Sequence, residues 1–493
     1  MPEHLRALIV VLTLAIVFFA FGKKAACTLA IADDDFNYRR NLWFALTLTA
    51  FLAHNFWVFM IVAGSLTFLG GLHERNKLAL YFFLFSALPM ISVEFRVVNV
   101  YLFDMHYGRL LSLTILLPAF IGLNRISQQT AKFGCHVQDI ILLAFLALLF
   151  LLNLRVEETV GNKIRNYGFY PFLDVFLPYY VASRSLNTLK DFRDALMSLS
   201  VACLVLAAIA VFECGRHWLL YNALPEALGV TWGYGAYLAR GDFLRAVGTA
   251  GQAIALGYEL AVAFGIFLFF GKSAGGFIVW RLGLAILTAG MVAALSRGPW
   301  VGAVTMVSVF LLTGPRALSN LTKFGSLALV LIAIIAITPI SDRVVSYLPF
   351  IGTVDAENVE GRKNLLSEGI DIILENPMFG SRTLELEQFR TGEGIIDIVN
   401  TYLLIGFTSG LTGLGLFTMF FLTICLQVFK SMQRLPNTND ERHRLGGTLL
   451  AVLSGILVII GTVSSITVIP YIYWSVAGLG VAYIRLAKQT IAQ

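Results

Sequence analysis

The sequence predicts an all-α integral membrane protein, a bundle of about 12–14 transmembrane helices with two long loops on the outer side. The first observation is composition: 58% of the 493 residues are hydrophobic, 13% are charged, and the mean hydropathy is +0.78. Soluble domains carry roughly 25% charged residues, so about half of the expected charge is missing. The second observation is that apolar runs of roughly 17–25 residues, enough to cross a hydrocarbon core of about 30 Å, recur along the chain.

The apolar runs are separated by polar or Gly/Pro breaks. The predicted spans are 7–22, 42–70, 77–93, 108–123, 137–154, 168–183, 194–213, 249–270, 277–295, 299–313, 322–339, 401–428, 447–466 and 469–484. The run 42–70 is overlong for one span, and 168–183 is short and aromatic. The first run follows Arg6, as the apolar part of a signal peptide follows a basic residue, but we expect it to remain as a helix.

An even number of spans places both termini on one side of the membrane. The short loops on that side hold most of the basic residues, whereas the first outer loop holds the acidic stretch Asp33 to Asp35. Because short loops rich in Lys and Arg stay inside, both termini are expected to be cytoplasmic. The predicted divisions are N-terminal transmembrane helices (1–213), a first long outer loop (214–247), a transmembrane core with arginine motifs (248–339), a large outer loop (340–400) and C-terminal transmembrane helices (401–493).

Charge and cysteine usage exclude two classes of function. The net charge of +6 comes from residues spread over many loops, and no run of Lys or Arg predicts nucleic-acid binding. The five cysteines form neither a CxxC motif nor a Cys/His pair at metal-ligand spacing. We therefore expect no metal site and no cofactor.

The large outer loop contains a helical pattern. Apolar residues recur near the helical period in the stretch "RKNLLSEGIDIILENPMFG", at Leu365, Leu366, Ile370, Ile373 and Leu374. The pattern stops at Asn376-Pro377, where a helix is expected to end. The spacing predicts an amphipathic helix that lies against the membrane or over a cavity.

An arginine interrupts the long apolar run 282–313 in the stretch "LSRGPWVGAV". As one helix this run would be about 48 Å long, roughly one and a half times what a membrane requires, so we expect it to fold back on itself. Pro299 does not continue a helix and Gly298 permits a tight turn, which places the break at "SRGP". The predicted topology then puts Arg297 at the outer interface.

Arg240, Arg245 and Arg362 are predicted on the same outer side as Arg297. Guanidinium groups bind phosphate oxygens in pairs, so a group of arginines at the mouth of a helix bundle suits a phosphate-bearing ligand. The alternative is that Arg297 binds lipid phosphates or caps a helix end, as many interfacial arginines do.

Four motifs in this region occur in a recognisable order. They are "RAVGTAGQAIALGYEL" from Arg245, "LSRGPWVGAV", "GRKNLLSEGIDIILENPMFG" and "VNTYLLIGFTSGLTGLGLF". Over roughly residues 245–414 the chain therefore resembles the O-antigen ligase and O-antigen polymerase superfamily of bacterial envelope proteins.

The resemblance implies an inverting, metal-independent glycosyltransferase at the periplasmic side of the bacterial inner membrane. The implied donor is an oligosaccharide linked to a polyprenyl diphosphate, the implied acceptor is a glycan, and a chain-length regulator and a flippase are implied partners. Arg240, Arg245, Arg297 and Arg362 would bind the diphosphate, with Arg297 also catalytic, and Asn400 and Tyr402 would lie on the acceptor side.

One position departs from the family pattern. Ligases of the family usually carry a histidine directly before the Asn of the Asn-x-Tyr-Leu motif, and this chain has Val399 there. Since valine accepts no proton, Asp397 is the candidate general base, with Glu393 as the alternative. The substitution favours a polymerase of exopolysaccharide, capsule or O-antigen over a ligase that transfers glycan to lipid A core or protein. A polysaccharide or lipid transporter is a third hypothesis.

Overall fold

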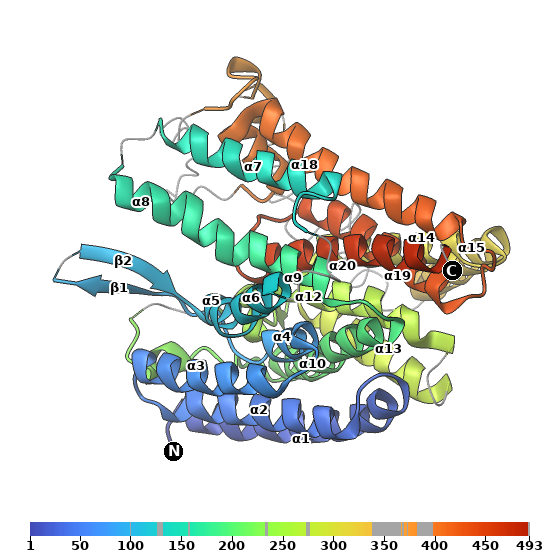
Figure 1. The fold of residues 1–493 in the computed structure, drawn as a ribbon. Coiled ribbons are helices and arrows are strands. Elements are labelled where there is room, and N and C mark those ends of the chain that lie inside the picture. Colours follow the sequence, from blue (N-terminus) through green and yellow to red (C-terminus); the bar gives the residue numbers. More distant parts are fainter. Residues whose placement is uncertain are drawn as a thin grey trace.

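The protein is a bundle of long helices, as Figure 1 shows. A computed structural model describes residues 1–98, 100–125, 132–155, 158–231, 235–272, 277–337, 366, 369–371, 373–381 and 398–491. The predicted all-α membrane fold is confirmed, because eight helices in the described part of the chain are both long and apolar enough to cross a membrane. These are 3–29, 56–73, 107–125, 189–216, 253–271, 317–334, 401–433 and 441–460. Three shorter apolar helices cover 137–153, 278–293 and 297–313.

The N-terminal elements include one β-hairpin and three π-helical turns (η1 to η3). They are α1 (Glu3–Leu29), α2 (Asp33–Leu52), α3 (Phe56–His73), α4 (Lys77–Phe85), β1 (Val93–Val97), β2 (Val100–Met105), α5 (Tyr107–Leu111), η1 (Ser112–Leu116), α6 (Leu117–Arg125), α7 (Val137–Asn153), α8 (Val160–Ile164), η2 (Arg165–Phe169), η3 (Phe172–Phe176), α9 (Leu177–Ser185) and α10 (Leu189–Arg216).

The C-terminal elements include a second, shorter hairpin and two 3₁₀ turns (η4 and η5). They are α11 (Leu224–Ala227), β3 (Ala239–Arg240), β4 (Phe243–Leu244), η4 (Gly248–Ala250), α12 (Ala253–Phe267), η5 (Leu268–Lys272), α13 (Phe277–Ala293), α14 (Arg297–Thr313), α15 (Ala317–Ile337), α18 (Thr401–Gln433), α19 (Glu441–Ile460) and α20 (Val468–Ile491).

The overlong run 42–70 is two helices rather than one span. α2 ends at Leu52, and the side chain of Asn55 caps α3 by accepting hydrogen bonds from the backbone N–H groups of Trp57 and Val58. Asp33 to Asp35 form the first turn of α2, not a loop, and acidic residues are favoured there by the helix dipole.

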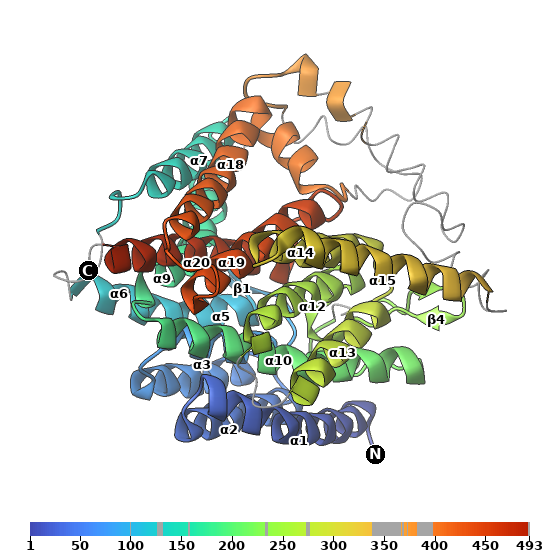
Figure 2. The same cartoon turned by 90° about the vertical axis from the view of Figure 1, so that its right-hand side faces the viewer.

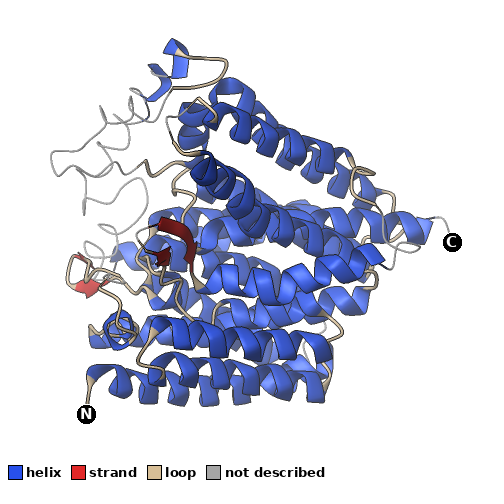
Figure 3. Ribbon diagram, turned by 60° about the vertical axis from the view of Figure 1, so that its left-hand side comes forward, coloured by secondary structure: helices blue, strands red, loops and turns tan. Residues whose placement is uncertain are grey.

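The turn between α2 and α3 reverses the chain once more than the sequence predicts, so the N-terminus and the C-terminus lie at opposite ends of the bundle. Near the N-terminus, Glu3 accepts a hydrogen bond of 2.9 Å from the indole of Trp218, just beyond the end of α10. Near the C-terminus, Arg485 donates to the carbonyl oxygen of Ser183, just before the start of α10. The prediction that both termini lie on one side is therefore wrong, and Figure 3 shows them at opposite ends.

We call the end of the bundle that holds residues 217–231, 235–252, 294–296 and 461–467 the loop end. α10, α12 and α14 all have one terminus there. In the core α10 packs against α1, α4, α12 and α13, and α12 also packs against α14 and α19. In Figure 2, α1 and α2 form the bottom of this arrangement, and α7 and α18 form the top.

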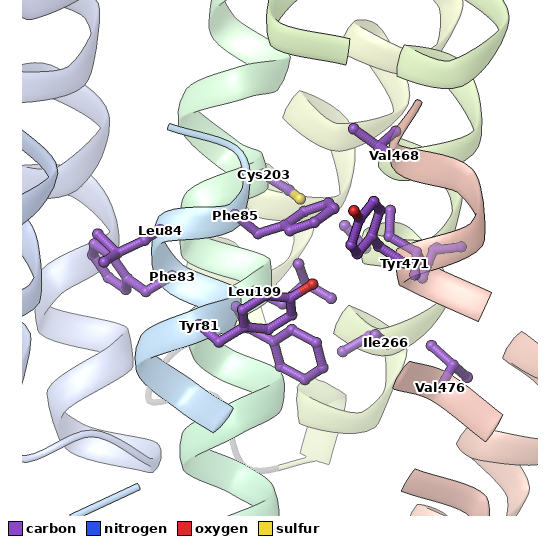
Figure 4. Close-up of a cluster of buried hydrophobic side chains, with 14 of the residues drawn as sticks. Tyr81, Phe83, Leu84, Phe85, Leu199, Cys203, Ile266, Val468, Tyr471 and Val476 are labelled. Carbon is purple, nitrogen blue, oxygen red and sulfur yellow. The ribbon is translucent and has the colours of Figure 1, made fainter. Parts of the chain in front are cut away.

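α4 is a short helix in the interior of the bundle. Eight of its nine side chains, from Leu78 to Phe85, are at most 3% exposed. Figure 4 shows Tyr81 and Phe85 of α4 facing Leu199 of α10 and Tyr471 of α20. The predicted span 77–93 therefore contains a helix only to Phe85, and its last residue begins strand β1.

Away from the loop end, buried charges connect distant segments. The guanidinium of Arg39 in α2 donates to Glu74 at 2.8 Å and to Asp194 of α10 at 2.5 Å, and its side chain is fully buried. Arg184 of α9 pairs with Asp139 of α7, and neither side chain is exposed. Because each charge has a partner, the bundle tolerates them, whereas removal of one partner would leave a buried charge unpaired.

Candidate functional site

The apolar run 282–313 folds back as predicted. α13 ends at Ala293 and α14 begins at Arg297, so the turn consists of Ala294, Leu295 and Ser296. The turn precedes Arg297, Gly298 and Pro299 rather than including them. Pro299 occupies the first turn of α14, where the backbone N–H that proline lacks would have no partner within the helix. Arg297 is thus the first residue of α14 and is half-buried at the loop end.

Gly298 does not form the tight turn that the sequence predicts. It is helical, and a Cβ atom at this position would lie 2.3 Å from the hydroxyl oxygen of Thr462. Glycine is therefore required for close approach between the start of α14 and the α19–α20 loop (461–467).

The β3–β4 hairpin brings two further arginines to the turn between α13 and α14. The guanidinium of Arg240 in β3 donates a 2.6 Å hydrogen bond to the carbonyl oxygen of Leu295. The backbone N–H of Ala246, next to Arg245, donates to the carbonyl oxygen of Ala293. These hydrogen bonds thus hold β3 with Arg240 and the residue after Arg245 against the turn that precedes Arg297, and all three arginine side chains are half-buried.

A buried carboxylate holds the segment that follows Arg245. Glu213, in the last turn of α10, is 1% exposed. Its Oε2 accepts hydrogen bonds from the backbone N–H groups of Val247 at 2.9 Å and Gly248 at 2.8 Å. Its Oε1 accepts a third, from Leu220 at 2.9 Å. Sequence reasoning missed this residue, although an acidic residue at the end of an apolar span was the available signal.

The start of α18 lies on the other side of the α19–α20 loop. The Asn400 side chain caps α18 by accepting hydrogen bonds from the N–H groups of Tyr402 and Leu403. The Tyr402 hydroxyl donates to the carbonyl oxygen of Leu457, and that of Thr401 donates to Val463 at 2.7 Å. Since Thr462 also abuts Gly298, one loop contacts both the Arg297 helix and the Asn400 helix.

Arg362, Asp397 and Glu393 lie outside the described residues. Two described residues of the same loop, Ile373 and Ile398, lie against α18. Ile373 is 7% exposed and clusters with Ile398, Leu403 and Phe407. The carbonyl oxygen of Ile398, which follows Asp397 in the chain, accepts a hydrogen bond from the Ser464 hydroxyl at 2.8 Å.

The helix termini give the loop end a positive field. α12, α14 and α18 all begin there, and the N-terminal end of a helix carries a partial positive charge and free N–H groups. With the side chains of Arg240, Arg245 and Arg297 added, this arrangement favours an anionic ligand and can stabilise negative charge that develops on a leaving group.

Glu259, an acidic residue within α12, binds the residue that follows α4. It accepts a hydrogen bond of 2.5 Å from the Ser86 hydroxyl, and its side chain is 1% exposed. The carbonyl oxygen of Ser86 in turn accepts a hydrogen bond from Thr249, four residues after Arg245. Glu259 thus supports the interior side of the arginine-bearing segment.

One comparison with known proteins bears on this site. Residues 282–418 match a family model described as O-antigen ligase. The match begins within α13 and ends within α18, so it includes Arg297, Asn400 and Tyr402 but not the β3–β4 hairpin. No curated protein matches the chain.

Proposed function

The chain belongs to the O-antigen ligase and polymerase superfamily and is a multi-pass protein of the bacterial inner membrane, and on this premise we propose that it is a polysaccharide polymerase. In this proposal it joins oligosaccharide repeats linked to polyprenyl diphosphate into exopolysaccharide, capsule or O-antigen. The reaction takes place at the periplasmic face, which we assign to the loop end.

The proposal is supported by hydrogen bonds that hold the segments carrying Arg240 and Arg245 against the turn between α13 and α14, where Arg297 begins α14. When the acceptor hydroxyl attacks the anomeric carbon, the bond to the diphosphate breaks and negative charge accumulates on the diphosphate. Arginines held in place before the reaction stabilise the transition state, in which this charge develops, more than the ground state. They therefore lower the barrier. They also supply the positive charge that a metal ion would otherwise provide, which makes the proposed reaction metal-independent. Arg362 is a further proposed ligand.

We assign deprotonation of the acceptor hydroxyl to Asp397, the nearest candidate base before the Asn-x-Tyr-Leu motif. Asn400 and Tyr402 are proposed to form the acceptor side. The side chains of Asn400 and Tyr402 form hydrogen bonds with backbone groups, so their proposed role is to fix the start of α18. Val399 favours a polymerase, whereas the match of residues 282–418 to the O-antigen ligase family favours the alternative, an O-antigen ligase.

The test is polysaccharide synthesis in the native host. Arg245→Ala, Arg297→Ala and Arg362→Ala should each abolish high-molecular-weight polysaccharide on gels while the protein still inserts in the membrane. Arg297→Lys should also be poor, because a point charge replaces a planar pair of donors. Arg434→Ala is the matched control, since Arg434 is exposed and follows α18 at the opposite end of the bundle. Wild-type polymer levels in Arg297→Ala would contradict the proposed mechanism.

Deletion of the gene separates the polymerase from the ligase. A polymerase makes the long chains, so its loss should leave only single repeats. A ligase acts on finished chains, so its loss should leave long chains on the lipid carrier. The length of the lipid-linked glycan, measured after extraction and mild acid release, decides between them.

A further inference from the structure

We propose that Glu213 is a positioning residue for the diphosphate site and acts through the backbone that carries Arg245. This inference rests on the proposed function, because it assigns the way in which that site is built. Glu213 itself is buried beneath the surface of the loop end and is not assigned any contact with substrate.

The contacts of Glu213 connect three segments of the chain. The carboxylate belongs to the last turn of α10, Oε1 accepts from the turn that contains Leu220, and Oε2 accepts from Val247 and Gly248. All three donors are backbone N–H groups at 2.8–2.9 Å. Charge-assisted hydrogen bonds of this kind are roughly twice as strong as neutral ones, so the carboxylate fixes these segments more firmly than a hydroxyl or amide could.

The two residues that Glu213 holds near Arg245, Val247 and Gly248, lie two and three positions after it in the chain. Val247 and Gly248 are held by Glu213, while Ala246 between them and Arg245 is held by the carbonyl oxygen of Ala293. Two anchors, on Ala246 and on Val247 and Gly248, therefore fix the backbone directly after Arg245. A side chain whose backbone is fixed before the ligand arrives loses less freedom on binding, so the clamp should strengthen diphosphate binding.

The chemistry of the site requires a carboxylate. Both of its oxygens accept, and they face donors on different segments. In Glu213→Gln the amide has one oxygen and one NH₂ group, so the NH₂ group would face at least one of the three backbone N–H groups. A buried donor facing another donor is unfavourable, and the segment would shift to relieve it.

The experiment measures the binding of farnesyl diphosphate and farnesyl monophosphate to the full chain in detergent. Glu213→Gln should weaken diphosphate binding about tenfold, as expected for the loss of one hydrogen bond to a charged group. Binding of the monophosphate should change less, because fewer arginine contacts are at stake. Glu213→Asp keeps the charge and should restore part of the affinity.

Two controls separate positioning from a general loss of stability. Asp191→Asn is the matched variant, because Asp191 lies at the other end of the same helix and also accepts backbone N–H groups, from Thr188 at 2.9 Å and Asn187 at 3.2 Å. It should leave the affinity for diphosphate unchanged. In an Arg245→Ala background, Glu213→Gln should cause no further weakening, since the side chain through which it acts is gone.

Wild-type affinity in Glu213→Gln, an equal loss in Asp191→Asn, or an undiminished further loss in the Arg245→Ala background would each overturn the inference. If Glu213→Gln does not fold, wild-type affinity in Glu213→Asp would overturn it. The proposed function fails differently, since it is contradicted if Arg297→Ala binds the diphosphate as tightly as the wild type and still makes polymer.

Discussion

At the scale of residues, the first turn of α14 shows how one motif combines two requirements. Arg297 adds a positive charge to the helix end that is already positive, an arrangement that an anionic ligand would stabilise. Gly298 next to it permits contact with Thr462. The sequence identified the arginine and the fold-back through length and hydropathy. It did not identify the role of Gly298, because that role depends on a loop more than 160 residues away.

Gly298→Ala should destabilise the folded protein by about 1–3 kcal/mol, the usual effect of overpacking a close contact. The added Cβ would lie 2.3 Å from the Thr462 hydroxyl oxygen and would separate α14 from the α19–α20 loop. The double variant Gly298→Ala/Thr462→Ala removes the oxygen and should recover most of the loss. Thermal unfolding in detergent gives the measurement, and equal instability of the single and double variants would argue against this contact.

The role of Glu213 could not be predicted from the sequence alone. A lone acidic residue near the end of an apolar run is compatible with a surface position, a pair with arginine or a backbone clamp. Only the fold shows that Val247, Gly248 and Leu220 direct their N–H groups at it. Arg362 and Asp397 stay predictions, since they lie outside the described residues.

At the scale of elements, α18 contains a break that holds the end of the large loop. Gly410 has φ 65° and ψ −169°, a backbone conformation that only glycine adopts readily. The stretch around Pro377 lies against this break. The backbone N–H of Leu411 donates a 2.7 Å hydrogen bond to the carbonyl oxygen of Pro377. Ser381 completes the attachment by donating its N–H to the carbonyl oxygen of Phe407. The stretch from Pro377 to Ser381, which follows the amphipathic pattern, is thereby fixed to α18.

Gly410→Ala should release this attachment. The new Cβ would lie 2.5 Å from the carbonyl carbon of Met378, and the backbone conformation would cost about 1–3 kcal/mol. We expect faster proteolysis between residues 366 and 400 and less polymer in the host. Gly415→Ala in the same helix is the control, because a Cβ there meets nothing within 4 Å. Identical cleavage rates for the two variants would rule out the attachment as the cause.

The sequence predicted most helices, because length and hydropathy define a span wherever polar or Gly/Pro breaks bound it. It failed at 42–70, where the turn Ala53-His54-Asn55 contains neither glycine nor proline and is too short to lower the hydropathy. It also missed β1 and β2, which lie almost entirely between the predicted spans 77–93 and 108–123.

At the scale of the whole molecule, the extra turn changes the topology. With α2 and α3 counted separately, the N-terminus lies at the loop end and the C-terminus at the other. The turns at the C-terminal end carry many basic residues, including Arg75, Lys77, Arg125, Lys132, Lys190, Arg316, Lys430 and Arg434. From the positive-inside rule we therefore propose that the C-terminal end lies in the cytoplasm and the N-terminus in the periplasm.

Reporter fusions at the two termini should give opposite results. Alkaline phosphatase, which is active only in the periplasm, should be active when fused before residue 1 and inactive when fused after residue 491. A cytoplasmic fluorescent reporter should show the reverse pattern. Two termini reporting the same compartment would disprove the topology derived from α2 and α3. A reporter in the exposed turn near Arg434 serves as the cytoplasmic reference.

The short helix α4 has a consequence for the order in which the molecule assembles. Nine residues span only about 14 Å, and the buried stretch from Ser86 to Ile91 that continues α4 is not helical. Non-helical backbone is unstable in lipid and must be covered by protein. The cover includes Thr249, which donates to the Ser86 carbonyl oxygen, and α10, both made more than a hundred residues later. We therefore expect this segment to reach its final position only after α10 and Thr249 have been synthesised.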